Sequence, residues 1–155
     1  MPTEQELAPD FTAQDDQGNT ISLSNYRAQW LVLYFYPKAM TRGWTIQAQG
    51  IRDDFAKYEQ AKAVVMGVSH DTVEDQAEFK KQENLPFILI ADPEHQIAEQ
   101  YGVWKERERF GKKFMGIERT TFLVDPDGKI AKIFPAVDPE THSQSVLDAL
   151  AELQG

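Results

Sequence analysis

The imidazoles and carboxylates that could carry acid–base or metal chemistry are dispersed along the 155-residue chain. His70, His95 and His142 stand at no spacing that would gather them around one metal ion, so no metal site is predicted. His70 and Asp71 are adjacent, but neighbours in an extended segment point to opposite sides and make a poor acid–base pair. No Ser-His-Asp constellation can be assembled from the sequence.

The chain contains no cysteine, which excludes disulfides, thiolate metal ligands and thiol redox chemistry within it. Met40 and Met115 are thioethers that can be oxidised but are not activated nucleophiles, and both are interpreted as packing residues. Asp53 and Asp54 are interpreted as part of a solvated helix face. No glycine-rich phosphate loop follows a strand, so no cofactor is predicted.

Apolar runs bounded by turn residues predict the strands that would position these side chains. Residues 30–36 and 63–69 are continuous apolar runs, which indicates strands buried on both faces. Residues 125–128, Asp-Pro-Asp-Gly, are a strong turn signal. The predicted strands are a hairpin within 11–23, then 30–36, 63–69, 87–90, 119–124 and 129–134.

Apolar residues at helical spacing predict the helices. Ala48, Ile51, Phe55 and Tyr58 recur every three or four residues and mark one face of a single helix. The other predicted helices are 72–84 with Thr72 as N-cap, 93–101 with Pro93 in its first turn and Gly102 at its end, and 140–153. Basic residues between 105 and 113 alternate with glutamates, and this segment is interpreted as a solvated loop.

The order of these elements predicts an α/β protein with one domain over residues 1–155. We expect a mostly parallel sheet covered on both faces, with an antiparallel edge from the last hairpin. A net charge of −9 and a pI near 4.8 argue against nucleic acid or an anionic membrane as partner. The longest apolar run is too short to span a bilayer and no signal peptide is visible, so a cytoplasmic location is predicted.

Five separate motifs, in this order and spacing, resemble the peroxiredoxins. They are Ala-Pro-Asp-Phe at 8–11, Leu-Val-Leu-Tyr-Phe-Tyr-Pro at 31–37, Val-Ser-His-Asp at 68–71, Tyr-Gly-Val-Trp at 101–104, and the run 116–128. The last two are similar to the bacterioferritin-comigratory, or peroxiredoxin Q, subfamily. The resemblance implies a thioredoxin-like fold with a central mixed sheet, flanking helices and an N-terminal β-hairpin. It also implies thioredoxin-dependent peroxide reduction.

The resemblance also implies where the active site lies. In that family a peroxidatic cysteine stands in the first turn of the helix after the central strand, and the matching residue here is Trp44. Pro37, Thr41 and Arg119 match the proline, threonine and arginine that support the cysteine. A helix N-terminus and an arginine lower a thiol pKa, which is the physical basis of that arrangement.

Three neighbours of Trp44 also depart from the family pattern. Arg42 stands where proline is usual, Gln47 where glutamate is usual, and Gln49 at the position of a resolving cysteine in many members. An indole cannot ionise, attack an O–O bond or form a disulfide. Peroxide reduction by the usual route is therefore predicted to be absent.

Two arrangements of the remaining pocket are possible. Arg119, the Thr41 hydroxyl and helix N–H groups would form an anion site if they stay exposed. Otherwise Trp44 fills the pocket, which we favour over an outward indole, and Arg119 forms a salt bridge with Asp53 or a neighbouring glutamate.

Four functions follow. The first is a pseudo-enzyme that binds a protein partner or a small anionic or carbonyl ligand near Arg119. The second is an enzyme with changed chemistry that uses Arg119, Thr41 and His70. The third is an interaction module anchored by an exposed Trp44, and the fourth is an altered or engineered form of an active peroxidase. The subfamily resemblance implies a monomer or weak homodimer.

Overall fold

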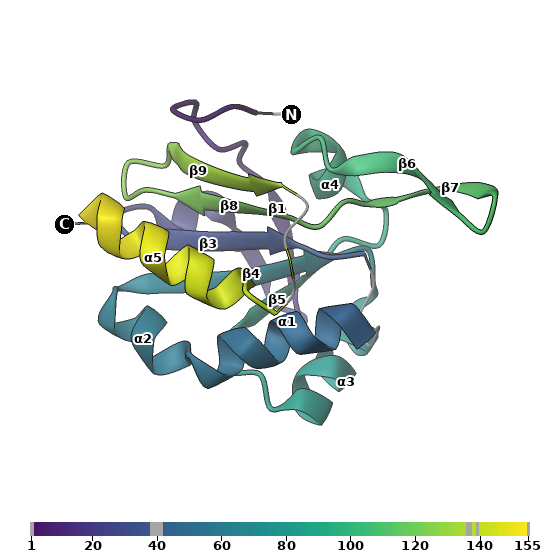
Figure 1. Ribbon diagram of the computed structural model, residues 1–155, viewed down its shortest axis with the longest axis horizontal. Coiled ribbons are helices and arrows are strands. Elements are labelled where there is room, and N and C mark those ends of the chain that lie inside the picture. The colour runs from purple at the N-terminus through teal and green to yellow at the C-terminus, as the bar shows by residue number, and fades with distance from the viewer. Residues whose placement is uncertain (1, 38–41, 136–137, 139, 155) are drawn as a thin grey trace.

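The computed structural model describes residues 2–37, 42–135, 138 and 140–154, and for residues 42–44 and 109 it describes the backbone alone. A seven-stranded sheet runs through the molecule in the order β2-β1-β5-β4-β3-β8-β9, and β6 and β7 form a separate ribbon (Figure 1). The strands are β1 Thr12–Asp15, β2 Thr20–Ser22, β3 Trp30–Phe35, β4 Ala63–Ser69, β5 Ile88–Ala91, β6 Trp104–Arg109, β7 Lys112–Ile117, β8 Thr120–Val124 and β9 Ile130–Pro135. The helices are η1 Leu23–Tyr26, α1 Arg42–Asp53, α2 Phe55–Gln60, α3 Val73–Glu83, α4 Gln96–Gln100 and α5 His142–Gln154.

Strand β3 is buried on both faces, as its continuous apolar run predicted. Val32 and Tyr34 point into the core that α1, α2, α3 and α5 cover. Leu31, Leu33 and Phe35 point into the second core, which α4 and the N-terminal segment cover. Alternation along one strand therefore supplies both cores, and β3 is a rigid support for whatever follows it.

The sheet is mixed rather than mostly parallel. Only β3–β4 and β4–β5 pair in parallel, and the other four neighbouring pairs are antiparallel. The prediction of a mostly parallel sheet is thus wrong, because β8 enters from the β6–β7 ribbon instead of from a crossover helix. The mixed sheet with an N-terminal hairpin that the resemblance implied is confirmed.

The single helix predicted from Ala48 to Tyr58 is two helices. Asp54 leaves the helical conformation between α1 and α2, and its Oδ2 accepts a hydrogen bond of 2.7 Å from Ser143 Oγ in α5. The Tyr58 hydroxyl lies 3.0 Å from the same Ser143 oxygen. The predicted apolar face is nevertheless buried, because the break is local and both helices still lie on the sheet.

Helix α4 begins later than predicted, at Gln96 instead of Pro93. The carboxylate of Asp92 accepts hydrogen bonds from the backbone N–H groups of Ile97 and Ala98, at 3.2 and 3.0 Å. Side-chain capping from outside the helix fixes its start, and Pro93 falls in the turn before it. The helix predicted at 72–84 is confirmed as α3.

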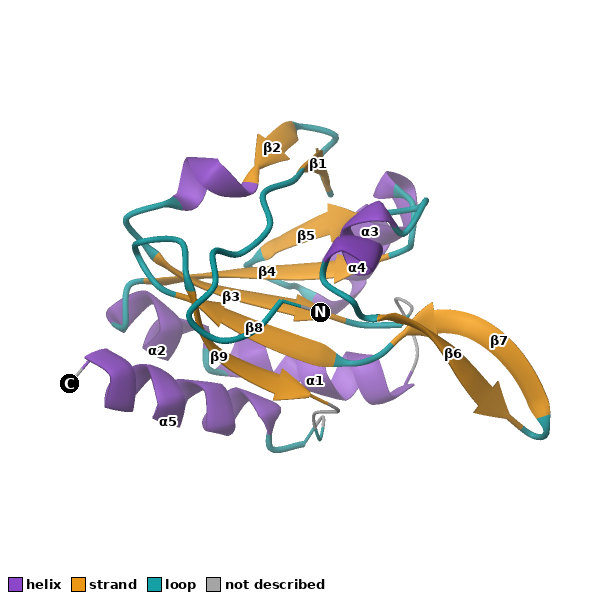
Figure 2. Cartoon of the chain, turned by 90° about the horizontal axis from the view of Figure 1, so that it is seen from above, coloured by secondary structure: helices purple, strands orange, loops and turns teal. Residues whose placement is uncertain are grey.

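The segment interpreted as a solvated loop is the β6–β7 hairpin. Phe110 and Gly111 both have positive φ angles, of 52° and 77°, which suits a two-residue type I′ turn. The hairpin extends away from the rest of the molecule (Figure 2). Met115, interpreted as a packing residue, is 50% exposed on β7.

Gly67 in β4 is the glycine whose replacement we expect to cost most stability. An added Cβ would lie 2.8 Å from the Tyr34 ring and 3.1 Å from Leu89 Cδ2, and neither buried side chain has room to move. Overpacking of this kind costs about 2–3 kcal/mol, so Gly67→Ala should lower the free energy of unfolding measured in urea by about that amount.

Gly50 is the matched control inside α1. Its added Cβ would meet only Ser143 Cβ, at an ordinary 3.8 Å. Alanine is favoured over glycine inside a helix by about 0.5–1 kcal/mol. Gly50→Ala should therefore stabilise the protein, and equal destabilisation by both substitutions would contradict this account of the packing.

Candidate functional site

The end of β3, the start of β8 and the start of α1 meet at one end of the sheet. Phe35 pairs with Thr120, so Arg119 lies beside the chain as it leaves β3 toward Pro37. The backbone of Trp44 is in the first turn of α1, as the family pattern implied. Thr41 and Met40 lie outside the described residues, and so does the Trp44 side chain, so the preference for a pocket-filling indole stays a prediction.

Arg119 carries an unneutralised charge at this end of the sheet. Its side chain is partly buried, and among the described residues it has no hydrogen-bond or ion-pair partner. Burial and then the positive charge of Arg107 lower the pKa of the guanidinium below its ordinary value. Both effects disfavour a positive charge, so a bound anion would be favoured here.

The predicted salt bridge between Arg119 and Asp53 is wrong. Asp53 pairs with Arg52 instead, with Nε and Oδ1 3.1 Å apart. The neighbouring glutamate, Glu118, pairs with Lys105. Asp53 is also the last residue of α1, at the end of the helix away from Trp44.

Below this end of the sheet, three elements meet at a buried histidine. His142, at the start of α5, is 2% exposed. Its Nδ1 lies 2.9 Å from Gln47 Nε2 in α1, and its Nε2 lies 2.6 Å from Thr121 Oγ1 in β8. An amide nitrogen only donates, so Nδ1 must accept and Nε2–H must donate to Thr121.

Burial lowers the pKa of His142 to about 4. The imidazole is therefore neutral at physiological pH and acts as a fixed polar link between α1 and α5. Gln47, one of the departures from the family pattern, is the residue that supplies this link from α1. No local signal in the sequence joins residues 47, 121 and 142, so sequence reasoning missed the contact.

A second buried network holds the end of β3 to α3. The Tyr36 hydroxyl donates to Gln76 Oε1, and Gln76 Nε2 donates to Ser69 Oγ at 3.0 Å and to the carbonyl of Ile90 at 2.8 Å. Ser69 in turn donates to Asp71 Oδ2. Asp71 is thus engaged by Ser69, and the strand end is tied to β5 and α3.

The acid–base pair of His70 and Asp71 is not formed, as the sequence indicated. The His70 ring packs edge-on against Trp104, with centroids 5.5 Å apart, and the His95 ring stacks on Trp104 at 4.0 Å. Among the described residues no group of three or more His, Asp or Glu side chains could hold a metal ion. Within the same part of the chain no helix is long and apolar enough to cross a membrane.

Gln49, at the position of a resolving cysteine in many family members, has a structural contact. Its Nε2 donates to Glu83 Oε1 at 2.8 Å and joins α1 to α3. Arg52, one turn further along α1, donates to the carbonyl of the same Glu83 at 2.8 Å. This face of α1 therefore holds helices together instead of serving chemistry.

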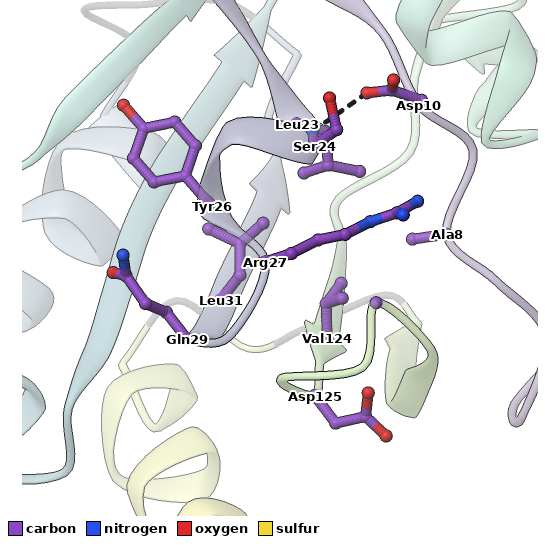
Figure 3. A pocket seen from close by; sticks show the side chains of 11 residues that line it. Ala8, Asp10, Leu23, Ser24, Tyr26, Arg27, Gln29, Leu31, Val124 and Asp125 are labelled. Carbon is purple, nitrogen blue, oxygen red and sulfur yellow. Dashed lines mark hydrogen bonds between the residues drawn. The ribbon is translucent and has the colours of Figure 1, made fainter.

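The cavity drawn in Figure 3 lies at the opposite end of the sheet. Leu31 at the start of β3 and Val124 at the end of β8 line it, together with Arg27 and Asp10. Its volume is about 10 Å³, which is room for about one water molecule. A ligand site is therefore better sought beside Arg119.

The fold and this end of the sheet define a class of protein. A model of the AhpC/TSA family matches residues 5–133, and the chain belongs to that family. More particularly, its relatives are bacterial Bcp peroxiredoxins. Peroxiredoxin Bcp of Bacillus subtilis is 43% identical over 146 residues, which are 94% of this chain and 93% of the relative. Peroxiredoxin Bcp of Escherichia coli K12 is 41% identical over 147 residues, which are 95% and 94%.

Solved structures agree with these relatives. The bacterioferritin comigratory protein of Xanthomonas campestris, solved in a study of its alkyl peroxide reduction activity, superposes with a TM-score of 0.89 at 30% identity and covers 94% of this chain and 92% of its own. BcpB of Mycobacterium tuberculosis superposes with a TM-score of 0.87 at 30% identity, covering 98% of each chain. The thioredoxin-like peroxiredoxin fold and the subfamily resemblance are confirmed.

Proposed function

We propose that this chain is a cysteine-free member of the AhpC/TSA family that does not reduce peroxides through a thiolate and acts by binding a small anion beside Arg119. The observation that supports it is a partly buried guanidinium with no partner among the described residues. A buried charge is ordinarily paired or bound to a ligand. Arg119 keeps the charge of the family's site while Trp44 replaces its nucleophile.

The surroundings of Arg119 favour a carboxylate or an oxyanion as the ligand. Arg107 adds a second positive charge close enough to lower the pKa of Arg119. The twelve-residue helix α1 begins at the same end of the sheet, and its N-terminus contributes a partial positive charge. Guanidinium groups bind such planar anions through paired hydrogen bonds.

An enzyme with changed chemistry is the weaker candidate. Acid–base catalysis needs a titratable pair within reach of a substrate, and Asp71 is engaged by Ser69 while His70 packs on Trp104. An altered form of an active peroxidase would need a thiol that the 155 residues do not contain.

Anion binding can be measured by calorimetry with benzoate and inorganic phosphate as probes. We expect Arg119→Gln to weaken binding at least about tenfold, since a hydrogen bond to a charged group contributes about 1.5–3 kcal/mol. Arg27→Gln, which removes an exposed arginine at the opposite end of the sheet, is the matched control and should bind as the unaltered protein does. Equal affinities for both variants, or no binding of either probe, would refute the anion site.

A further inference from the structure

The β6–β7 hairpin has two chemically different faces. Its register pairs Arg107 with Phe114 and Lys105 with Gly116, so these residues share one face with Lys112. We call Lys105, Arg107, Lys112 and Phe114 the basic face. The opposite face carries Glu106, Glu108, Lys113 and Met115.

Contacts within the basic face show that its side chains lie together. A Cβ added to Gly116 would lie 3.3 Å from the Phe114 ring and 3.5 Å from Arg107 Cδ, so both side chains fold over the same glycine. Phe114 is still 46% exposed, and Phe110 at the turn is 91% exposed. An aromatic ring flanked by cations is a typical anchor of protein interfaces.

The charge of this hairpin differs in sign from that of the rest of the chain. Residues 104–117 contain five cations and two carboxylates, a formal charge of +3, and a chain total of −9 leaves −12 on the remainder. A two-stranded ribbon is marginally stable alone in water, and this one extends away from the rest of the chain in Figure 2. We call the β6–β7 hairpin the arm and the rest of the chain the body. The body of a second copy offers the complementary charge.

A groove on the body suits such an arm. It has a volume of about 230 Å³ and is lined by Val73, Pro93 and Ile97 together with Asp92 and Glu94. A cavity of about 150 Å³ suffices to bind benzene, so the groove has room for an aromatic ring. Glu94 is exposed at this groove and can meet a cation from the arm.

We propose that the basic face of the hairpin docks, with Phe114 as its anchor, in the groove at Asp92 and Glu94 of a second copy of this chain. The contact joins two different surfaces. It therefore forms a two-fold symmetric pair where each arm fills the other copy's groove, and a head-to-tail chain where the exchange is not reciprocal. Opposite charges on arm and groove make the association weaken as salt rises.

Sedimentation velocity over a range of protein concentration, at low and at high salt, measures this association. We expect Lys112→Glu with Phe114→Ser to raise the dissociation constant at least about tenfold, because an aromatic anchor and an adjacent charge are lost. Lys113→Glu with Met115→Ser is the matched control. It makes the same charge change and a similar apolar loss on the opposite face, and it should leave association within about twofold of the unaltered protein.

A second variant tests the groove. Glu94→Lys should weaken association as the arm variant does, and a mixture of the two variants should recover pairs, because one intact arm then meets one intact groove. A monomer at every concentration in low salt would overturn the proposal, as would equal loss from the arm and control variants. Failure of the mixture to associate would overturn it too. Circular dichroism of each variant verifies that the fold is kept.

Discussion

Trp44→Cys is expected to take up one oxygen atom per chain from hydrogen peroxide, whereas the unaltered protein is expected to remain inert. The thiolate would attack the O–O bond, form a sulfenic acid and release water. Position 44 lies in the first turn of α1, and α1 begins at the end of the sheet where β8 starts, directly after Arg119 (Figure 1). Both the helix N-terminus and the guanidinium stabilise a thiolate.

The expected rate can be compared with that of free cysteine. A pKa lowered by one unit from about 8.5 gives roughly tenfold more thiolate near neutral pH. A thiolate of lower pKa is also a weaker nucleophile, by about threefold per pKa unit. We therefore expect the variant to react at least about threefold faster than free cysteine, followed by stopped-flow fluorescence of Trp30 and Trp104 and by mass spectrometry. Adding Arg119→Gln to Trp44→Cys should slow the reaction.

Trp44→Ser is the control for removal of the indole alone, and it should be as inert as the unaltered protein. An unreactive Trp44→Cys would mean that the departures at Arg42 and Gln47 have dismantled the supporting pocket. Rapid stoichiometric oxidation of the unaltered protein would mean that a site without cysteine performs redox chemistry. Peptide mapping distinguishes such a site from slow, nonspecific oxidation of the four methionines.

Acidification is expected to destabilise the protein through His142. Its folded pKa of about 4 lies below the ordinary value of 6.5, so the unfolded chain binds a proton that the folded protein does not. Stability is therefore complete above the unfolded pKa and falls as pH drops toward the folded pKa. With these two pKa values, the free energy of unfolding should fall by about 2 kcal/mol between about pH 7.5 and about pH 5, and further below pH 5.

Urea unfolding at both pH values measures this loss, and His142→Gln isolates it. A glutamine side chain can still accept from Gln47 and donate to Thr121, but it has no proton to gain. The variant should therefore lose about 2 kcal/mol less than the unaltered protein over this pH interval. His95→Gln serves as the control, since that imidazole stacks on Trp104 and its side chain is 36% exposed. An unchanged pH dependence in His142→Gln would contradict the assignment.

The elements that the sequence predicted correctly are those whose signals lie within one short segment of the chain. β3 is recognisable because its own run of apolar residues fills both cores. α3 is recognisable because Thr72, its N-cap, accepts a hydrogen bond from Asp75 only three residues away. Arg119 was located by the family resemblance alone, and its role stays a prediction; it stands directly before Thr120, which pairs with Phe35 of β3.

What the sequence did not predict depends on partners far along the chain. The break at Asp54 follows from Ser143, a residue of α5, and the link between Gln47 and Thr121 passes through His142. The β6–β7 hairpin was missed because charge, and not hydrophobicity, alternates along it. Its turn was missed too, because Phe110 adopts a positive φ of 52°, whereas the usual two-residue turn pairs are Asn-Gly, Asp-Gly and Gly-Gly.

The hydrogen bonds from Tyr36 through Gln76 to Ser69 have a consequence for how this chain tolerates change. They hold Tyr36, the residue directly after β3, against Gln76 of α3, which in turn bonds to Ser69 of β4 and Ile90 of β5. The start of α1 is therefore not needed to hold the end of β3 in place. Substitutions at the start of α1, such as Arg42 and Trp44, can therefore accumulate while the scaffold stays intact.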